Sequence, residues 1–358
     1  MNRNKTIDII KGIAILSIII GHSSWTIGNG FNIGPFVYSY HIMAFMFVAG
    51  FCYNAEKYAN RFREFVGSKL LSVIPLYFVY NLVFVLAHNT LLHYHMIDGD
   101  PYTLVSMISF FAMGLCMTTN ENLIGPFWFL GMYLVAQIVF GFIMEMSSWM
   151  KAKYAKHIFM AVAIVALGAV GLYITCNQVM LPYHVQTSLL AIPFMMIGYL
   201  VKVYWDSLRR WFNAIGCVVS AILLYILIQQ GLAGSDLSAN IIYNYKLYYL
   251  TTLIGIYFCI SFAQTIEKIP ALNSIMTYAG RKSFHLMALH MTAFKIVDGI
   301  YGRMRGLAPE TYGIFPHSYD IWWVYYLVGF GGVLGVIYLA DCIKKIIAKK
   351  VRVENVEN

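Results

Sequence analysis

Charged side chains are scarce in this sequence, and acidic ones are the scarcest. Only 11% of the 358 residues are Asp, Glu, Lys or Arg, with 16 acidic residues in all, whereas 60% are hydrophobic. The mean hydropathy is +0.67, far above the balance of a soluble domain. This composition excludes an ordinary soluble protein and predicts a chain that crosses a lipid bilayer several times.

Long polar blocks and paired cysteines are also missing. Apolar stretches of about 20 residues, the length of a membrane-crossing helix, recur along the chain without room for a soluble domain. We therefore expect one integral membrane domain over residues 1–358. The six cysteines lie scattered in apolar segments, so the sequence predicts neither a disulfide framework nor a zinc site. The first apolar segment lacks a small-residue cleavage pattern and is expected to be a retained helix.

Basic residues outnumber acidic ones and give a net charge of +9. They fall mostly in short clusters between the apolar segments, where the positive-inside rule of membrane proteins explains them. We therefore expect the lipid bilayer as a partner of this chain, and no nucleic acid.

The basic linkers also test how often the chain crosses the membrane. If all the apolar segments crossed, every basic linker after the third span would lie outside, against the positive-inside rule. If one segment, Pro101–Thr119, does not cross the membrane, all of these linkers lie in the cytoplasm. The sequence thus predicts an all-α polytopic bundle of about ten spanning helices, with both termini cytoplasmic and Pro101–Thr119 as a re-entrant or interfacial helix. The eleven apolar segments begin near Ile7, Phe36, Lys69, Tyr102, Phe127, His157, Val185, Trp211, Lys246, Phe284 and Ile321.

The first predicted helix carries polar residues on an apolar background, in the stretch "DIIKGIAILSIIIGH" from Asp8 to His22. Lys11 and His22 return to within roughly 20° of one direction on a helix and lie about 16 Å apart along its axis. Asp8 precedes Lys11 by three residues, a spacing that favours an ion pair at the cytoplasmic end. His22 is left alone in the outer half, where a histidine is either functional or a hydrogen-bonding partner between helices.

A second histidine, His41, lies near the outer end of the second predicted span. Because a short uncharged linker joins the two spans, His22 and His41 are expected to approach each other at one depth. Neutral imidazole is a competent base near neutral pH, so the pair suits proton transfer. A metal site would need a third ligand from His88, His93 or His95, whose spacing matches no zinc signature, and no metal is predicted.

These segments resemble those of a known family, acyltransferase family three, and within it the fucose 4-O-acetylase-like branch. The basic residue, ten intervening residues and histidine of the first helix are similar to the family's first-helix motif, with Lys11 where the broader family has Arg. The similarity continues in "YHIMAFMFVAGF", "KLLSVIPLYFVY", "GPFWFLGMYL", "LLAIPFMMIGYLVK" and "AGRKSFHLMALHM". Ala44 replaces a proline and Met287 a tyrosine of the family pattern.

The resemblance implies O-acyl transfer, with acetyl favoured, from cytoplasmic acyl-CoA to a hydroxyl of an envelope or capsular glycan, in what we expect to be a bacterial plasma membrane. It also implies that His22 is the central catalytic residue. Two routes stay open, since His22 can act as general base in a ternary complex, which we prefer, or be acylated itself.

The expected site residues follow from the resemblance together with position in the chain. Lys and Arg are the natural partners of phosphate, so basic residues on the cytoplasmic side are expected to hold the CoA phosphates. We assign catalysis to His22 and His41, acyl-CoA binding to Lys11, Arg61, Arg63, Lys69 and Lys282, and acceptor binding to Tyr40, Trp128 and His290.

Two other functions fit ten spans with buried polar groups. A polysaccharide or small-molecule transporter or flippase would use a similar cavity, although the paired interrupted helices typical of such carriers are not apparent. A non-catalytic subunit for polysaccharide export or assembly is the third alternative. The sequence does not identify the acceptor.

Overall fold

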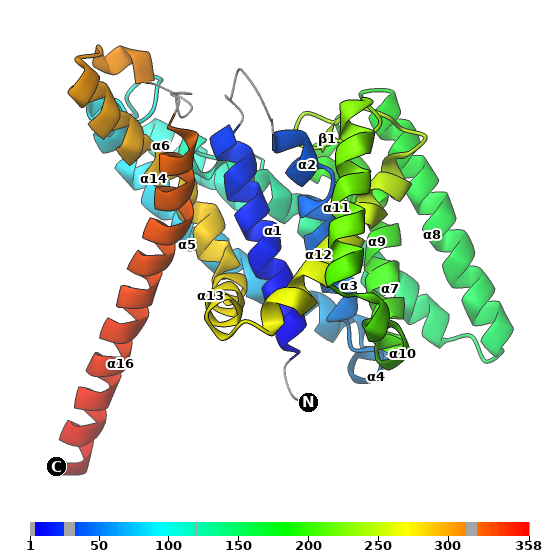
Figure 1. Cartoon of the computed structure of the whole chain (residues 1–358). Helices are drawn as coiled ribbons and strands as arrows, with labels where there is room; N and C mark the ends of the chain where they lie inside the picture. Colours follow the sequence, from blue (N-terminus) through cyan, green and yellow to red (C-terminus); the bar gives the residue numbers. More distant parts are fainter. Residues whose placement is uncertain (1–3, 25–32, 119, 313–320, 358) are drawn as a thin grey trace.

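The computed structural model describes residues 4–24, 33–118, 120–312 and 321–357, and these form a helical bundle (Figure 1). Within these ranges the single antiparallel pair of strands, β1 Ser235–Asp236 and β2 Ile241–Ile242, is short. In chain order the helices are α1 Lys5–Ser24, α2 Gly34–Tyr38, α3 His41–Phe51, α4 Ala55–Tyr58, α5 Phe62–His93, α6 Leu104–Leu115, η1 Asn122–Phe127, α7 Trp128–Ser148, α8 Lys153–Cys176, η2 Pro182–His184, α9 Val185–Val203, α10 Trp205–Leu208, η3 Arg209–Trp211, α11 Ala214–Gln229, α12 Tyr248–Glu267, α13 Pro270–Arg281, α14 Ser283–Arg305, η4 Pro309–Tyr312, α15 Trp322–Tyr326, η5 Leu327–Gly332 and α16 Val333–Glu357.

The predicted polytopic membrane bundle is confirmed. Among the described residues, 8 helical segments are long and apolar enough to cross a membrane, and the count rises to 9 if a bent pair, Trp205–Trp211 with Ala214–Gln229 at 69°, is one span. The chain is therefore a multi-pass membrane protein. The eight segments are Lys5–Ser23, Gly34–Phe51, Phe62–His93, Asn122–Ser148, Tyr154–Cys176, Pro182–Val203, Tyr248–Glu267 and Trp322–Lys349.

Helix α14 is a further long segment, and it differs from the others in polarity. Its 23 residues reach about 34 Å, enough to span the hydrocarbon core. It is not among the eight apolar spans, and it carries Lys295 and Asp298, both buried, with Lys295 Nζ 3.2 Å from Asp298 Oδ2. Since residues three apart meet on a helix, the two charges neutralise each other inside the bundle.

The segment predicted not to cross forms helix α6. Its 12 residues extend only about 18 Å, too short for the bilayer core. The Thr103 hydroxyl caps its first turn by accepting a hydrogen bond from the Ser106 amide at 3.3 Å. The Asn89 side chain of α5 bonds both the amide and the carbonyl of Tyr102, at 2.6 and 2.8 Å. Protein groups thus satisfy the backbone at the start of this helix, as a segment that does not cross requires.

Helix α1 runs through the middle of the bundle (Figure 1). It meets the amphipathic helix α13 backbone to backbone, because a Cβ atom at Gly12 would fall on the carbonyl of Met276 and one at Gly280 on the carbonyl of Asp8. Close approach at small residues is the usual way that helices associate in membranes. This contact fixes the position of the helix that carries His22.

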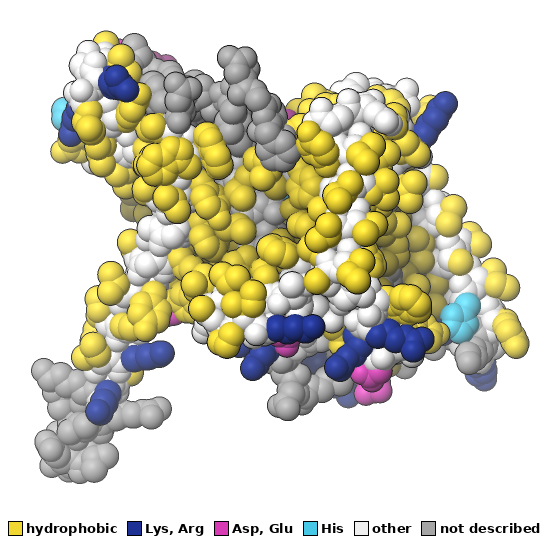
Figure 2. All heavy atoms as spheres, in the orientation of Figure 1, with side chains coloured by type: hydrophobic (Ala, Val, Ile, Leu, Met, Phe, Trp, Pro, Cys, Tyr) yellow, Lys and Arg dark blue, Asp and Glu magenta, His cyan; other side chains and the backbone are white. Residues whose placement is uncertain are grey.

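The start of α1 and the end of α16 lie on the same side of the bundle (Figure 1). Lys and Arg side chains gather along this edge in the face seen in Figure 2, below a wide yellow apolar band. The arrangement agrees with the positive-inside reasoning that places both termini together. We refer to this edge as the basic side and to the opposite edge as the outer side, names that follow the topology expected from the sequence.

Candidate functional site

A pocket of about 610 Å³ opens beside the outer end of α1. This volume is in the range of sites for small organic ligands. The wall combines apolar side chains with imidazole, amide, hydroxyl and carboxylate groups. Its lining residues are Ile18, His22, Tyr38, His41, Ile42, Asn120, Asn122, Gly125, Pro126, Trp128, Phe129, Asp236, Leu237, Ser238, Met287 and Met291.

His22 in this pocket is bonded to His290, which the fold brings from α14. His22 Nδ1 lies 2.8 Å from His290 Nε2, and the two rings stack at a centroid distance of 5.1 Å and an angle of 19°. His290 Nδ1 lies 3.0 Å from the carbonyl of Leu286. A carbonyl only accepts, so His290 carries its hydrogen on Nδ1 and its Nε2 accepts from His22 Nδ1–H when both rings are neutral. His22 Nε2 is then left with a free lone pair.

His41 lines the same pocket but is held differently. Its Nδ1 lies 2.7 Å from the carbonyl of Val37, which fixes the hydrogen on Nδ1 and leaves Nε2 as an acceptor. His22 and His41 both line this pocket, as expected from the sequence, and their assignment to catalysis stays a prediction. The sequence assigns His290 to the acceptor, whereas the structure makes His290 the direct partner of His22.

The two aromatic residues expected at the acceptor side separate in the structure. Trp128 lines the pocket, with its ring 4.5 Å from that of His184. Tyr40 is buried elsewhere, with its hydroxyl 3.1 Å from the Ser17 hydroxyl, and it is not a lining residue. Tyr38 lines the pocket instead, and the assignment of Tyr40 to the acceptor stays a prediction that this geometry does not favour.

Four polar pocket residues, Asn120, Asn122, Asp236 and Ser238, were missed by reasoning from the sequence. Asp236 Oδ1 accepts hydrogen bonds from the Ser238 amide at 3.1 Å and its hydroxyl at 2.6 Å. Asn, Asp and Ser are ordinary residues of turns, so no local signal separates these from other loop residues. Only the fold brings the loop with Asn120 and Asn122 and the loop with Asp236 and Ser238 to one wall of the pocket.

At the basic side, Lys11 and Lys69 belong to one group of cations. Lys11 Nζ lies 3.8 Å from Asp8 Oδ1, the ion pair predicted from their spacing, and Arg281 Nε lies 3.2 Å from Asp8 Oδ2. Lys69 Nζ lies 5.2 Å from the centre of the Phe65 ring and within electrostatic range of Lys11 and Lys57. These four cations outnumber the Asp8 carboxylate that pairs with two of them, a surplus that suits a polyanionic ligand.

Of the other three residues expected to bind acyl-CoA, two are held in ion pairs and one is exposed. Arg61 is 3.7 Å from Glu64, with both side chains exposed, and Arg63 is also exposed. Lys282 Nζ is 2.6 Å from Asp341 Oδ2 and faces α16. Exposed ion pairs contribute little to stability, so Arg61 can leave Glu64 readily.

A second hollow, of about 1100 Å³, was not expected from the sequence. It lies beside the start of α1 and has both acidic and basic walls. Its lining residues are Asn4, Lys5, Thr6, Trp205, Asp206, Arg209, Gln264, Glu267 and Lys268. Within the described residues, no group of three or more His, Cys, Asp or Glu side chains is arranged to hold a metal ion.

Comparison with known proteins adds a family assignment to this geometry. No curated protein and no solved structure matches the sequence significantly. The family model of acyltransferase 3, described as an acyltransferase domain, matches residues 4–342. The match runs from α1 into the first part of α16 and includes both histidines of the bonded pair. The chain thus belongs to the acyltransferase 3 family and is a multi-pass membrane acyltransferase.

Proposed function

We propose that this protein is an O-acyltransferase, with acetyl as the favoured group, that acts on a hydroxyl of an envelope or capsular glycan, as the resemblance to the fucose 4-O-acetylase-like branch implies. The donor is cytoplasmic acyl-CoA. The observation that carries the proposal is the contact of His22, which lines a pocket, with the buried His290 behind it, at 2.8 Å between Nδ1 and Nε2. A base held by a second group that fixes its tautomer is the usual arrangement for activating a nucleophile.

His22 acts as the general base in this scheme. Its Nε2 takes the proton from the acceptor hydroxyl while the oxygen attacks the thioester carbonyl. The tetrahedral intermediate then collapses, the C–S bond breaks, and the His22 imidazolium returns the proton to the departing CoA sulfur. His290 stabilises the imidazolium, because its Nε2 still accepts from His22 Nδ1–H.

The remaining polar groups of the pocket suit an acceptor with several hydroxyls. Asn120 and Asn122 offer amide donors and acceptors, and Trp128 offers an aromatic face. His41, the second residue assigned to catalysis, lies with His22 on the wall of this pocket and faces the acceptor beside the base. The acceptor therefore needs no passage into the cytoplasm, since His22 lies at the outer end of α1.

The bound acyl-CoA donor extends along the length of α1. Lys11 and His22 lie about 16 Å apart along the helix axis, and the CoA phosphates sit among Lys11, Lys57, Lys69 and Arg281. The pantetheine arm then extends along the bundle and presents the thioester to His22. Lys11 and His22 lie on one face of α1 but far apart along it, and this supports separate sites for the CoA phosphates and for the thioester.

Acceptor-dependent release of free CoA by the purified protein in lipid nanodiscs tests the proposal. We expect acetyl-CoA turnover, followed with a thiol reagent, to rise when the correct member of a panel of envelope glycans is added. Movement of glycan across liposomes without any thiol release would instead indicate the transporter.

Replacing Lys69 with Ala is expected to raise the KM for acetyl-CoA by roughly tenfold, because a hydrogen bond between charged groups contributes about 1.5–3 kcal/mol. The kcat should change much less. Initial rates over a range of acetyl-CoA concentrations measure both constants, and Lys151→Ala, an exposed lysine of another linker, is the matched control. A rise in KM for Arg209→Ala with none for Lys69→Ala would move the donor to the second hollow.

A further inference from the structure

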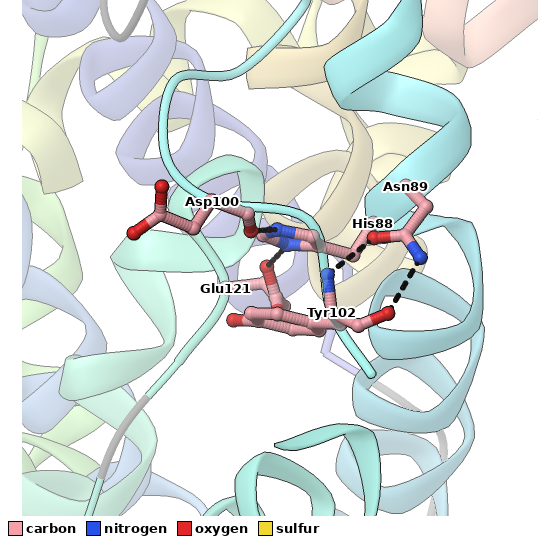
Figure 3. A network of polar contacts seen from close by, with 5 residues as sticks. All are labelled: His88, Asn89, Asp100, Tyr102 and Glu121. Atoms are coloured by element: carbon pink, nitrogen blue, oxygen red, sulfur yellow. Dashed lines mark hydrogen bonds and ion pairs between the residues drawn. The ribbon is translucent and has the colours of Figure 1, made fainter. Parts of the chain in front are cut away.

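A buried polar network lies between the outer end of α5 and the loop before η1, apart from the two bonded histidines (Figure 3). His88 Nδ1 is 3.0 Å from Glu121 Oε2, with only 5% of each side chain exposed. The Tyr102 ring lies face to face with His88, at a centroid distance of 3.4 Å and an angle of 4°. Both ionisable groups are therefore sealed between α5, this loop and the loop between α5 and α6 that carries Tyr102.

The hydrogen bonds of His88 show how many protons the pair holds. His88 Nε2 lies 3.2 Å from the carbonyl of Asp100, which only accepts, so Nε2 carries a hydrogen. His88 Nδ1 faces the Glu121 carboxyl group, and this contact needs one further proton, on either the ring or the carboxyl group. In both forms the pair has no net charge, so loss of either partner leaves the other uncompensated.

Burying the His88–Glu121 pair costs more free energy than a purely stabilising contact would justify. Taking two ionisable groups out of water costs several kcal/mol each before their attraction offsets it. Glu121 Oε1 forms no hydrogen bond of ordinary geometry within the described part of the chain, although the Tyr102 hydroxyl interacts with the same carboxyl group. An apolar pair of similar size would stabilise the fold at least as well, and the pair is better explained by the position that it enforces.

That position is the wall of the pocket. Asn120 and Asn122, the neighbours of Glu121 in the chain, both line the pocket. The Tyr77 hydroxyl of α5 donates a hydrogen bond to Asn120 Oδ1 at 3.0 Å. Residues of α5 therefore hold this loop at Glu121 and at the adjacent Asn120.

We propose that the buried His88–Glu121 pair positions the acceptor-binding wall, by holding Asn120 and Asn122 at the pocket. His88 and Glu121 are positioning residues, and the two asparagines bind the hydroxyls of the acceptor. This inference rests on the proposed acyltransferase function and adds residues for acceptor specificity that lie outside the pair of bonded histidines.

Kinetics of the Glu121→Ala variant in nanodiscs test the inference. We expect the KM for the glycan acceptor to rise by about tenfold, since a lost hydrogen bond to a charged group is of this order. The KM for acetyl-CoA and the slow hydrolysis of acetyl-CoA without acceptor should stay within about twofold, because neither uses the asparagines. Glu145→Ala is the matched control, as it removes another buried carboxylate, on α7, that does not line the pocket.

A conservative variant keeps the test decisive if Glu121→Ala does not fold. Glu121→Gln retains a side-chain amide that can donate to the Nδ1 lone pair of neutral His88, so we expect a smaller rise in the acceptor KM, of about threefold, in a protein that melts close to the wild-type temperature. An unchanged acceptor KM in both folded variants, or in Glu121→Gln alone if only that variant folds, would overturn the inference while leaving the acyltransferase intact. A wild-type protein without acyl transfer to any acceptor would instead overturn the proposed function, and the inference with it.

Discussion

Replacing His22 with Gln is expected to lower acyl transfer by roughly 10²–10⁴-fold, the contribution of a well-placed general base. Glutamine approximates the size of histidine and can still donate a hydrogen bond to His290 Nε2, which lies 2.8 Å from His22 Nδ1 in the native protein. It cannot take a proton from a hydroxyl at neutral pH. The loss should therefore appear in kcat, with smaller changes in the KM of either substrate.

The measurement is acceptor-dependent CoA release, with the variant and wild type reconstituted at equal density. His93→Gln is the matched control, because His93 is exposed at the end of α5 and does not line the pocket. Full activity in a folded His22→Gln protein would show that another group is the base. Incubation with radiolabelled acetyl-CoA alone distinguishes the two routes, since stable label on wild-type protein that is lost in His22→Gln would indicate an acylated histidine.

His290 allows a second test of the same pair. His290→Leu removes the acceptor of the His22 Nδ1–H bond and leaves that donor without its buried partner. We expect a smaller loss of kcat than for His22→Gln, because the base remains but its orientation is no longer fixed. Equal losses in the two single variants and in the double variant would show that the histidines act as one unit.

The second large effect is expected at the contact between α3 and α9. A Cβ atom at Gly50 would fall on the carbonyl of Met195, and one at Gly198 on the carbonyl of Phe47. Gly50→Ala should therefore push the two helices apart and cost about 1–3 kcal/mol or more, as overpacked sites do. Because α3 begins with His41, transfer activity should fall together with stability.

Thermal unfolding of the purified protein in detergent measures this change. Gly67→Ala is the matched control, since Gly67 lies within α5 and a Cβ atom there would meet no heavy atom within 4 Å from elsewhere in the described chain. Alanine is favoured over glycine in a helix by about 1 kcal/mol, so Gly67→Ala should melt at or above the wild-type temperature. A Gly50→Ala protein as stable as Gly67→Ala would mean that α3 and α9 do not meet at Gly50.

Much of the fold can be predicted because its signals are local. Long apolar runs predict which segments span the membrane, and the basic linkers predict on which side of the membrane each loop lies. The distribution of basic linkers also identifies Pro101–Thr119 as the segment that does not cross, which its own apolar sequence does not reveal. Helix α6 at Leu104–Leu115 agrees with that inference. The Asp8–Lys11 pair is predictable for the same reason, because a separation of three residues on one helix defines a distance.

The sequence by itself determined the class of the protein, the order of its membrane segments, the family resemblance and the place of His22 near the end of the first helix. Tertiary structure alone decided that His290, 268 residues away, bonds His22, that Tyr38 rather than Tyr40 lines the pocket, and that Glu121 pairs with His88. The physical reason is that composition and periodicity fix how each helix lies in the bilayer, since that depends on its own residues. Which side chains meet depends on the rotation and contact of whole helices, which backbone approaches such as Gly12 against Met276 set only after the bundle has formed.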